Sequence, residues 1–255
     1  MQLTNNDRKL YADLDRARTR RETGLFMAEG TKCVLDTLDY FDLHFLCATS
    51  GWLERHGHIL SHKHIECATV KRADLERMSH MSTPPEVLAI YRIPQTAIDP
   101  TAIENGLTLL LDRVQDPGNL GTIMRVADWY GVRQIICSPE TVDVWSPKVV
   151  QSTMGAIARV RCRYTSLLDF IAAHPDIPVC GTFLDGDNIY ASQPPQKAMI
   201  VMGNEGQGIS PEVAACVTHR LLIPSYPPGE PTSESLNVGM ATAITLSEFR
   251  RTQLR

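Results

Sequence analysis

Residues 107–125 read LTLLLDRVQDPGNLGTIMR. The first five, Leu107 to Leu111, are almost continuously apolar, which is typical of a strand buried on both faces of a sheet. A turn at Asp116 to Asn119 follows, and the spacing after it predicts a helix that presents Asn119, Thr122 and Arg125 near its N-terminal end. The loop between such a strand and helix lies at the carboxyl end of the strand, where open parallel sheets bind ligands. The stretch therefore predicts an α/β fold with a functional loop at this position.

Four later segments repeat the apolar pattern and are separated by helical patterns. They cover residues 133–137, 178–183, 198–202 and 220–223. Unbroken apolar strands that alternate with helices indicate a parallel sheet covered on both faces. We therefore expect a parallel-sheet domain over residues 105–255.

A polar stretch punctuated by Pro94, Pro100 and Gly106 separates this domain from residues 1–95. The front segment has a mixed pattern and predicts a small α/β domain. The expected elements are helices over 5–20 and 28–40, a strand over 43–48, a helix after Ser50, a strand over 65–68, a helix from Lys71 and a strand over 87–93.

The composition excludes several classes of protein. With 43% hydrophobic and 21% charged residues, the 255-residue chain is neither a disordered protein, nor a collagen, nor a coiled coil. No apolar run approaches the roughly 20 residues that span a bilayer, and the first 21 residues lack the apolar core of a signal peptide. We therefore expect a cytoplasmic protein without a membrane partner.

The spacing of the cysteines and histidines does not indicate a metal site. The seven cysteines are odd in number and form no C-x-x-C pair, so they are interpreted as free thiols in a reducing compartment. The four clustered histidines lack nearby carboxylates and are expected to be solvated; they are His56, His58, His62 and His64. We expect no metal cofactor.

Two further loops carry polar and glycine residues after predicted strands. Residues 203–210 read GNEGQGIS, with three glycines around Glu205, and their spacing fits neither a P-loop nor G-x-G-x-x-G. Residues 235–238, Ser-Leu-Asn-Val, open the last helix, with Ser235 as the expected N-cap. The small residues after Asn237 suggest close packing near a ligand. Taken singly, each loop also has a structural interpretation as a turn followed by a helix cap.

Together and in this order, the loops resemble the three motifs of the SpoU/TrmH family of RNA ribose 2′-O-methyltransferases. The matching stretches are N-x-G-x-x-x-R at 119–125, G-N-E-G-x-G at 203–208 and I-P…S-L-N-V at 223–238, with an S-x-G-A-like element at 152–156. The front segment, residues 1–95, is similar to the ribosomal-protein-like RNA-binding domain that is often fused in front of this catalytic domain.

The resemblance implies a catalytic domain with a deep trefoil knot, S-adenosylmethionine as cofactor, and homodimers that bind RNA across both subunits. It implies a cofactor pocket at Gly203, Ile223 and Leu236. It implies Arg125 as the catalytic residue, with Asn119, Glu205, Ser235 and Asn237 at the other polar motif positions. One departure stands out: the ten residues Ser225 to Glu234 make a loop longer than is usual in the family, and Tyr226-Pro227-Pro228 replaces the common Met-x-Gly.

The role of Arg125 has two interpretations. An arginine side chain is almost always protonated in water, so it is an unusual base for a ribose hydroxyl. Either Arg125 stays cationic and pairs an RNA phosphate and the developing alkoxide, or a phosphate and a dry site help a transiently neutral arginine to act as base. In both, Ser235 and Asn237 orient groups by hydrogen bonding and Glu205 holds its loop.

The leading functional hypothesis is methyl transfer from S-adenosylmethionine to a ribose 2′-hydroxyl of structured RNA, with ribosomal RNA favoured over tRNA. The alternatives are a catalytically inactive RNA-binding or ribosome-assembly factor and a different small-molecule enzyme on the same kind of sheet. The chain carries a net charge of −4, so RNA contact would need a local basic face. We expect phosphate contacts from the densest basic cluster, Arg16, Arg18, Arg20 and Arg21, with a solvated helix face as the alternative.

Overall fold

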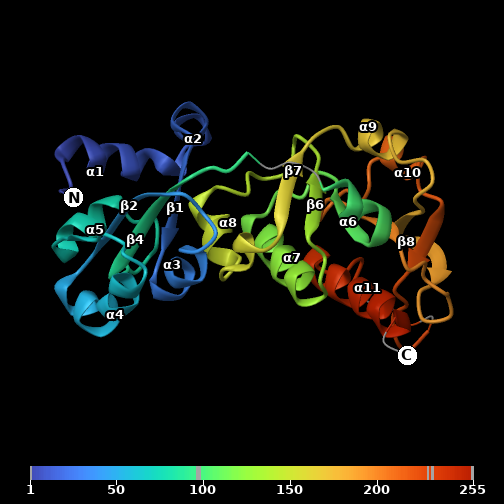
Figure 1. Ribbon diagram of the computed structural model, residues 1–255. Helices are drawn as coiled ribbons and strands as arrows, with labels where there is room; N and C mark the ends of the chain where they lie inside the picture. Colours follow the sequence, from blue (N-terminus) through green and yellow to red (C-terminus); the bar gives the residue numbers. More distant parts are fainter. Residues whose placement is uncertain (1, 96–98, 229, 231–232, 254–255) are drawn as a thin grey trace. The chain divides into compact units, whose positions relative to one another are not determined.

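The computed structural model describes residues 2–95, 99–228, 230 and 233–253 (Figure 1). The chain divides into two compact units. The first unit contains residues 1–95 together with 143–158, and the second contains residues 96–142 and 159–255. Residues 143–158, which were expected in the sheet domain and include the S-x-G-A-like element, therefore pack with the first unit.

The first unit is a four-stranded sheet with helices. Its elements are α1 (Asn5–Ala12), α2 (Ala17–Thr23), β1 (Leu25–Glu29), α3 (Thr31–Thr37), β2 (Leu43–Ala48), α4 (Ser50–His62), β3 (Ala68–Thr69), α5 (Arg72–Met78), β4 (Val87–Arg92) and α8 (Pro147–Ser152). The strand order is β1-β4-β2-β3, in which β4 is antiparallel to both neighbours and β3 is parallel to β2.

Two expected helices of the first unit were wrong in extent. The helix expected over 5–20 is interrupted by a 3-10 turn at Asp13–Asp15, since aspartates compete for backbone hydrogen bonds and favour turns. The helix expected from Ala28 begins only at Thr31, because Leu25–Glu29 is a fully buried strand paired with β4. Gly30, with φ 85°, separates this strand from the helix.

The second unit is a six-stranded sheet with helices. Its elements are α6 (Pro100–Asn105), β5 (Leu107–Leu111), α7 (Pro117–Trp129), β6 (Gln134–Cys137), β7 (Arg161–Tyr164), α9 (Leu167–Ala172), β8 (Val179–Asn188), β9 (Ala198–Met202), α10 (Pro211–Ala214), β10 (His219–Leu222) and α11 (Val238–Gln253). The strand order is β10-β8-β9-β5-β6-β7, and every pair is parallel.

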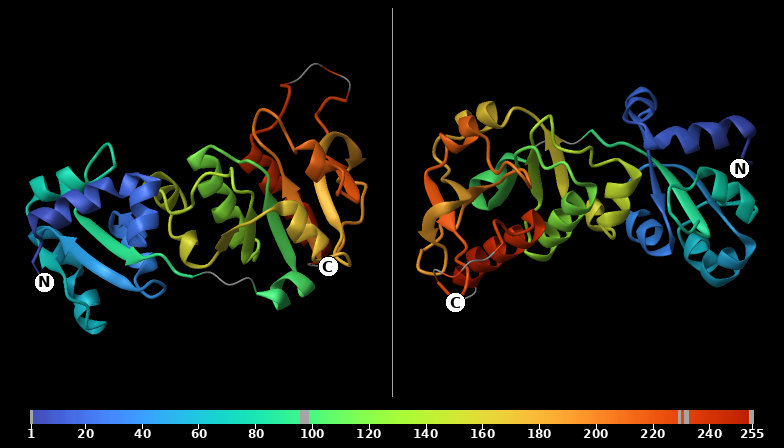
Figure 2. Two further views of the ribbon diagram at one scale, coloured as in Figure 1. Left: turned by 90° about the horizontal axis from the view of Figure 1, so that it is seen from above. Right: turned by 180° about the vertical axis from the view of Figure 1, so that it is seen from behind.

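The expected parallel sheet is confirmed. Every residue of the two central strands, β5 and β9, is buried, so both faces of the sheet are covered there. Ile103 of α6, Leu167 of α9 and Val213 of α10 belong to one apolar cluster with strand residues. Helix α7 lies along α11, as the right-hand view of Figure 2 also shows. No helix among the described residues is both long and apolar enough to cross a membrane.

This sheet positions the candidate site. Because the strands are parallel, the carboxyl ends of β5, β9 and β10 lie at the same edge, and the three motif loops leave the sheet there. The last of these loops leads from β10, an edge strand, to α11 beside α7.

Candidate functional site

The three motif loops meet at the side chain of Asn119. Its Nδ2 donates a hydrogen bond to Oε1 of Glu205 at 2.9 Å. Its Oδ1 accepts one from Nδ2 of Asn237 at 2.8 Å. Asn119 lies in the first turn of α7, Glu205 in the loop after β9, and Asn237 just before α11. One carboxamide therefore connects three stretches of the chain, with Glu205 86 positions and Asn237 118 positions from Asn119 in sequence.

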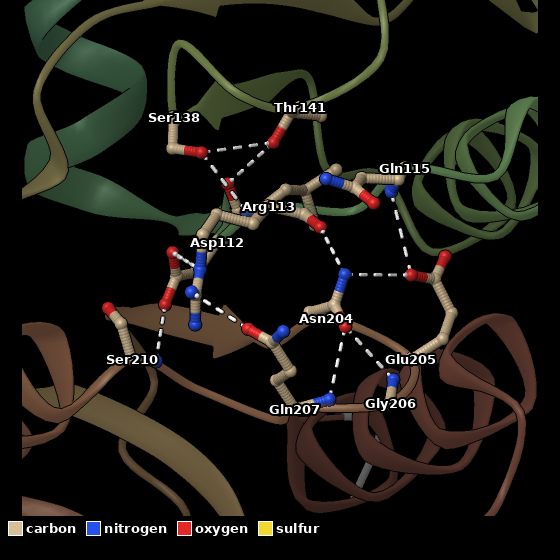
Figure 3. Close-up of polar contacts among 11 residues, drawn as sticks. Asp112, Arg113, Gln115, Ser138, Thr141, Asn204, Glu205, Gly206, Gln207 and Ser210 are labelled. Carbon is tan, nitrogen blue, oxygen red and sulfur yellow. Dashed lines mark hydrogen bonds and ion pairs between the residues drawn. The ribbon is translucent and has the colours of Figure 1, made fainter.

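Asn204 fixes the loop after β9 and ties it to the loop after β5 (Figure 3). Its Oδ1 accepts hydrogen bonds from the backbone N–H groups of Gly206 and Gln207, each at 3.0 Å. Its Nδ2 donates to the carbonyl oxygen of Arg113 at 2.8 Å. The side chain thus shapes its own turn and joins it to the end of β5. Sequence analysis did not single out Asn204, although it lies inside the glycine motif.

Asp112 makes the second connection between these loops. Its side chain is almost fully buried, and its Oδ2 accepts a hydrogen bond from the backbone N–H of Ser210 at 2.6 Å (Figure 3). Sequence analysis missed Asp112 as well. A signal was present, because Asp112 directly follows an apolar strand at the edge where ligands bind.

Position 203 must be a glycine because backbone atoms of Gly208 and Ile209 lie very close to it. A Cβ atom on Gly203 would lie 2.2 Å from the carbonyl carbon of Gly208 and 2.3 Å from the nitrogen of Ile209. Paired backbone hydrogen bonds between Asn204 and Gly208, both 2.9 Å, close the turn at this point. No other residue type fits position 203 unless the loop moves.

A pocket of about 970 Å³ opens between β8 and the loops after β9 and β10. This volume is at the upper end of the roughly 300–1,000 Å³ found for small-molecule sites. Gly203, Ile223 and Leu236, the residues expected to bind a cofactor, all line it. Two carboxylates, those of Glu205 and Glu234, line it as well.

The start of α11 differs from the expectation at Ser235. The helix begins at Val238, and Asn237 caps it: Oδ1 of Asn237 accepts hydrogen bonds from the N–H groups of Gly239 (2.9 Å) and Met240 (3.3 Å). The structural alternative for Ser235, a role as helix N-cap, is therefore excluded because the chain is not yet helical there, and its role in the site stays a prediction. Ser235 is exposed and lines the pocket.

The close packing expected after Asn237 is confirmed at Gly239. A Cβ atom on Gly239 would lie 3.0 Å from Cγ2 of Thr122 on α7. Helix α7, which carries Asn119, and helix α11, which directly follows Asn237, therefore approach closely, and this keeps the two amides within hydrogen-bonding reach.

Arg125 lies on α7, less than two turns beyond Asn119, and its side chain is exposed. In the part of the chain that the structure describes, it makes no hydrogen bond or ion pair and does not line the pocket. Trp129, one turn further along α7, is 85% exposed. The end of α7 thus presents a cation and an aromatic ring to solvent.

The basic cluster expected to contact RNA is only partly at the surface. Arg20 is 2% exposed. Its guanidinium pairs with Asp143 at 2.5 Å and donates to the carbonyl oxygens of Leu14 and Asp15 at 2.7 and 2.8 Å. The interpretation of Arg20 as a phosphate contact is therefore wrong, because its hydrogen-bonding capacity is used inside the first unit.

The other three arginines of the cluster are exposed. Arg18 pairs with Glu22 at 2.7 Å and Arg16 lies 3.7 Å from Asp13, both in open surface pairs. Such pairs contribute little to stability and exchange readily for other anions. Arg21 is also exposed. Among the described residues, no group of three or more His, Cys, Asp or Glu side chains could hold a metal ion.

The fold and the joined loops together define a protein with a ligand pocket at the carboxyl edge of a parallel α/β sheet. The model of the SpoU rRNA methylase family matches residues 106–247, and the model of the MRM3-like substrate binding domain matches residues 5–89. The chain belongs to the SpoU rRNA methylase family.

Several proteins of this kind resemble the chain along most of its length. The 23S rRNA (guanosine(2553)-2′-O)-methyltransferase RlmP of Bacillus subtilis is 31% identical over 190 residues, which cover 73% of each chain. A solved structure of a TrmH-family protein from Porphyromonas gingivalis is 39% identical, covers 98% of each chain and has a TM-score of 0.85. An AdoMet-bound rRNA methyltransferase from Sinorhizobium meliloti is 30% identical, with a TM-score of 0.85 over 100% of this chain and 99% of that one.

Proposed function

We propose that this protein transfers a methyl group from S-adenosylmethionine to a ribose 2′-hydroxyl of structured RNA, with ribosomal RNA favoured over tRNA. The observation that carries the proposal is the hydrogen-bonded chain Glu205–Asn119–Asn237, which joins all three motif loops beside the pocket. The names of the relatives support both the ribose position and ribosomal RNA. The free cysteines favour the reducing cytoplasm as the place where the protein acts.

The pocket fits S-adenosylmethionine. Gly203 exposes backbone atoms in the wall of the pocket because it has no side chain. Ile223 and Leu236 offer apolar contact for the adenosine. The carboxylates of Glu205 and Glu234 place negative charge around a donor that carries a positively charged sulfonium. When bound, the donor supplies an electrophilic methyl carbon, and the work of the protein is to align this carbon with the ribose oxygen. Such positioning can lower a barrier by about 7–11 kcal/mol.

The polar residues divide into positioning and reacting groups. Asn119 and Glu205 hold the start of α7 against the pocket loop, and Asn237 holds the start of α11. Ser235, exposed at the pocket, orients the ribose by hydrogen bonding. Arg125 is the catalytic residue. It either pairs the phosphate and the developing alkoxide as a cation or, with a phosphate beside it, removes the hydroxyl proton.

We also propose a homodimer. Arg125, Trp129 and Met240 are exposed on the adjacent helices α7 and α11, and the latter two are 85% and 52% exposed. Large apolar and aromatic side chains that a fold leaves exposed are suited to a protein–protein interface. A second copy seated on this surface would bring RNA across both subunits and into reach of Arg125.

The proposal includes a deep trefoil knot formed by the segment after β10. This segment starts at the edge of the sheet and returns to α11, which packs on the helix that follows the central strand β5. The first unit is proposed to hold the RNA substrate, through Arg16, Arg18 and Arg21 rather than Arg20.

Arg125→Ala tests the assignment of the catalytic residue. We expect the variant to lose ribose methylation while its affinity for S-adenosylmethionine, measured by calorimetry, stays within a few-fold of wild type, because Arg125 does not line the pocket. Methylation at the wild-type rate by purified Arg125→Ala would refute the assignment. If the wild-type protein binds RNA but transfers no methyl group to any ribose, the protein is an RNA-binding or assembly factor instead.

A further inference from the structure

Two exposed apolar side chains line the pocket at positions that are not motif residues. Leu184 and Tyr226 both line the pocket, and they are 78% and 91% exposed. Neither side chain is packed in the core of the second unit, so neither is explained by folding. Large apolar side chains that stand exposed at the mouth of a binding pocket are suited to contact a ligand.

A bulge in β8 presents Leu184. Gly181 of β8 pairs with Arg220 of β10, but the next residue of β10, Leu221, pairs with Asp187. Residues 182–186 therefore project out of the strand pair, between its two paired stretches. A Cβ atom on Gly186 would lie 2.6 Å from the carbonyl carbon of Leu221, so the bulge closes tightly on the neighbouring strand. Bulges occur often beside active sites, where they redirect side chains.

Both neighbours of Leu184 are held in place. The guanidinium carbon of Arg220 lies 3.5 Å from the centre of the Phe183 ring, and its Nη2 pairs with Oδ1 of Asp185 at 2.5 Å. Arg220 thus fixes the residues on either side of Leu184 while the leucine itself stays exposed. These contacts with Arg220 make the bulge an ordered part of the pocket wall.

Tyr226 lines the same pocket from the loop after β10, the strand that pairs with the bulged β8. This loop runs from Ser225 to Glu234, and two prolines directly follow Tyr226. Proline restricts the backbone, so presenting the ring costs less conformational entropy than it would in a flexible loop.

The charges of the pocket lining favour a neutral aromatic ligand over a phosphate. Glu234 lines the pocket, and the only cation among the described residues of the bulge and its partner strand, Arg220, already pairs with Asp185. A phosphate in the pocket would be repelled by Glu234, whereas a nucleobase carries no charge.

We propose that Leu184 and Tyr226 form a subsite for the nucleobase attached to the ribose that receives the methyl group. This inference rests on the proposed function. The 2′-oxygen must lie in line with the donor methyl, so the base on the adjacent ribose carbon has to lie at the pocket mouth. RNA-binding proteins commonly hold unpaired bases by stacking them on aromatic side chains, and Tyr226 supplies such a ring, with Leu184 as its apolar neighbour.

Tyr226→Ala tests the subsite in steady-state methylation assays with the full-length protein and RNA that lacks the modification. We expect kcat/KM for RNA to fall roughly 5- to 150-fold, the range found when stacking aromatics are replaced by alanine. Tyr226→Phe, which keeps the ring, should stay close to wild type. Calorimetry with S-adenosylmethionine should give the same affinity for all three proteins. Tyr190→Ala is the matched control, because Tyr190 is 52% exposed on the same unit and does not line the pocket.

Two results would overturn the subsite in an active protein. In one, Tyr226→Ala methylates RNA like wild type. In the other, it loses affinity for S-adenosylmethionine with an unchanged KM for RNA, which would assign the ring to the adenine of the donor. Failure of the proposed function is distinguishable from both, since wild-type protein would then transfer no methyl group, and the subsite would be rejected with it.

Discussion

The carboxamide of Asn119 offers both a donor and an acceptor, and the structure uses both. The donor meets Glu205 and the acceptor meets Asn237, so a single side chain sets the separation of two loops. Neither aspartate nor leucine, which are of similar size, could make both hydrogen bonds. This explains in physical terms why an asparagine stands at the first motif position.

Also at the scale of single residues, Gly203→Ala should weaken cofactor binding and lower the stability of the fold, although it adds only a methyl group. The new Cβ would lie 2.2 Å from backbone atoms that cannot move without opening the turn. We expect affinity for S-adenosylmethionine to fall at least 10-fold by calorimetry, together with a lower melting temperature. Gly206→Ala in the same loop is the control, because its Cβ would meet only Oδ1 of Asn204 at 3.7 Å. Equal affinities of the two variants would show that the close approach at Gly203 does not shape the pocket.

Individual residues also mark where sequence reasoning failed. Arg20 belongs to a run of arginines, and only the fold shows that it pairs with Asp143, 123 positions away. Ser235 has the right chemistry for a cap, yet the helix begins three residues later and Asn237 takes that role. Both errors have one cause, because local sequence does not report which long-range partner a polar group finds.

At the scale of elements, an acidic residue near the end of α7 fastens the helix to the sheet. Asp128 pairs with Arg159 and Arg133, each at 2.8 Å. Burial alone would raise the pKa of Asp128, but the hydrogen bonds and charges of these two arginines outweigh it and hold the pKa below its usual value. The ionised form of Asp128 is therefore stabilised by folding.

A depressed pKa in the folded state means that this contribution is present above the unfolded pKa of about 3.9 and is lost as the pH falls through the lower folded value. Asp128→Asn should lower the free energy of unfolding at pH 7 by roughly 1.5–3 kcal/mol, as expected for hydrogen bonds to charged groups. The difference from wild type in urea unfolding should shrink as the pH drops below about 4. Asp176→Asn, at an exposed aspartate, is the control. A difference that stays constant from pH 7 to pH 3 would contradict this role of the ion pairs.

Whether a strand could be predicted depended on how it is buried. β5 and β9 match the expected ranges residue for residue, since strands buried on both faces have unbroken apolar sequences. β1 was missed: no element was expected over residues 21–27, and Ala28 and Glu29 were assigned to the following helix, because only pairing with β4 makes Leu25–Glu29 a strand. β7 was missed, since this edge strand alternates exposed arginines with a buried cysteine and a half-buried tyrosine.

At the scale of the whole molecule, the division of the chain does not follow a single boundary in the sequence. Residues 143–158 lie within the range of the SpoU family model yet belong to the first unit. Trp145 packs on Phe26 with ring centres 4.6 Å apart, and Asp143 pairs with the buried Arg20. A fragment that ends at Gln95 would leave the Arg20 charge buried without its carboxylate. The polar stretch near residue 95 marks one boundary between the units, but no change in composition marks the boundaries at residues 143 and 158.

The candidate site itself was largely predictable, because its residues cluster in three short loops that follow apolar strands. What the sequence could not indicate is how the loops are joined, through Asn204 and Asp112, or that Leu184 and Tyr226 also line the pocket. These features depend on strand register and on a bulge, which no local pattern encodes.

The most direct test of the function is a map of ribose methylation in total RNA from cells with and without the gene, followed by restoration of the missing mark in vitro with purified protein and methyl-labelled S-adenosylmethionine. We expect one or a few ribose 2′-O-methyl groups, in ribosomal RNA, to disappear without the gene and to be restored by wild-type protein but not by Arg125→Ala. Identical maps from the two strains, or a labelled methyl group found on a base instead of a ribose, would contradict the proposed function.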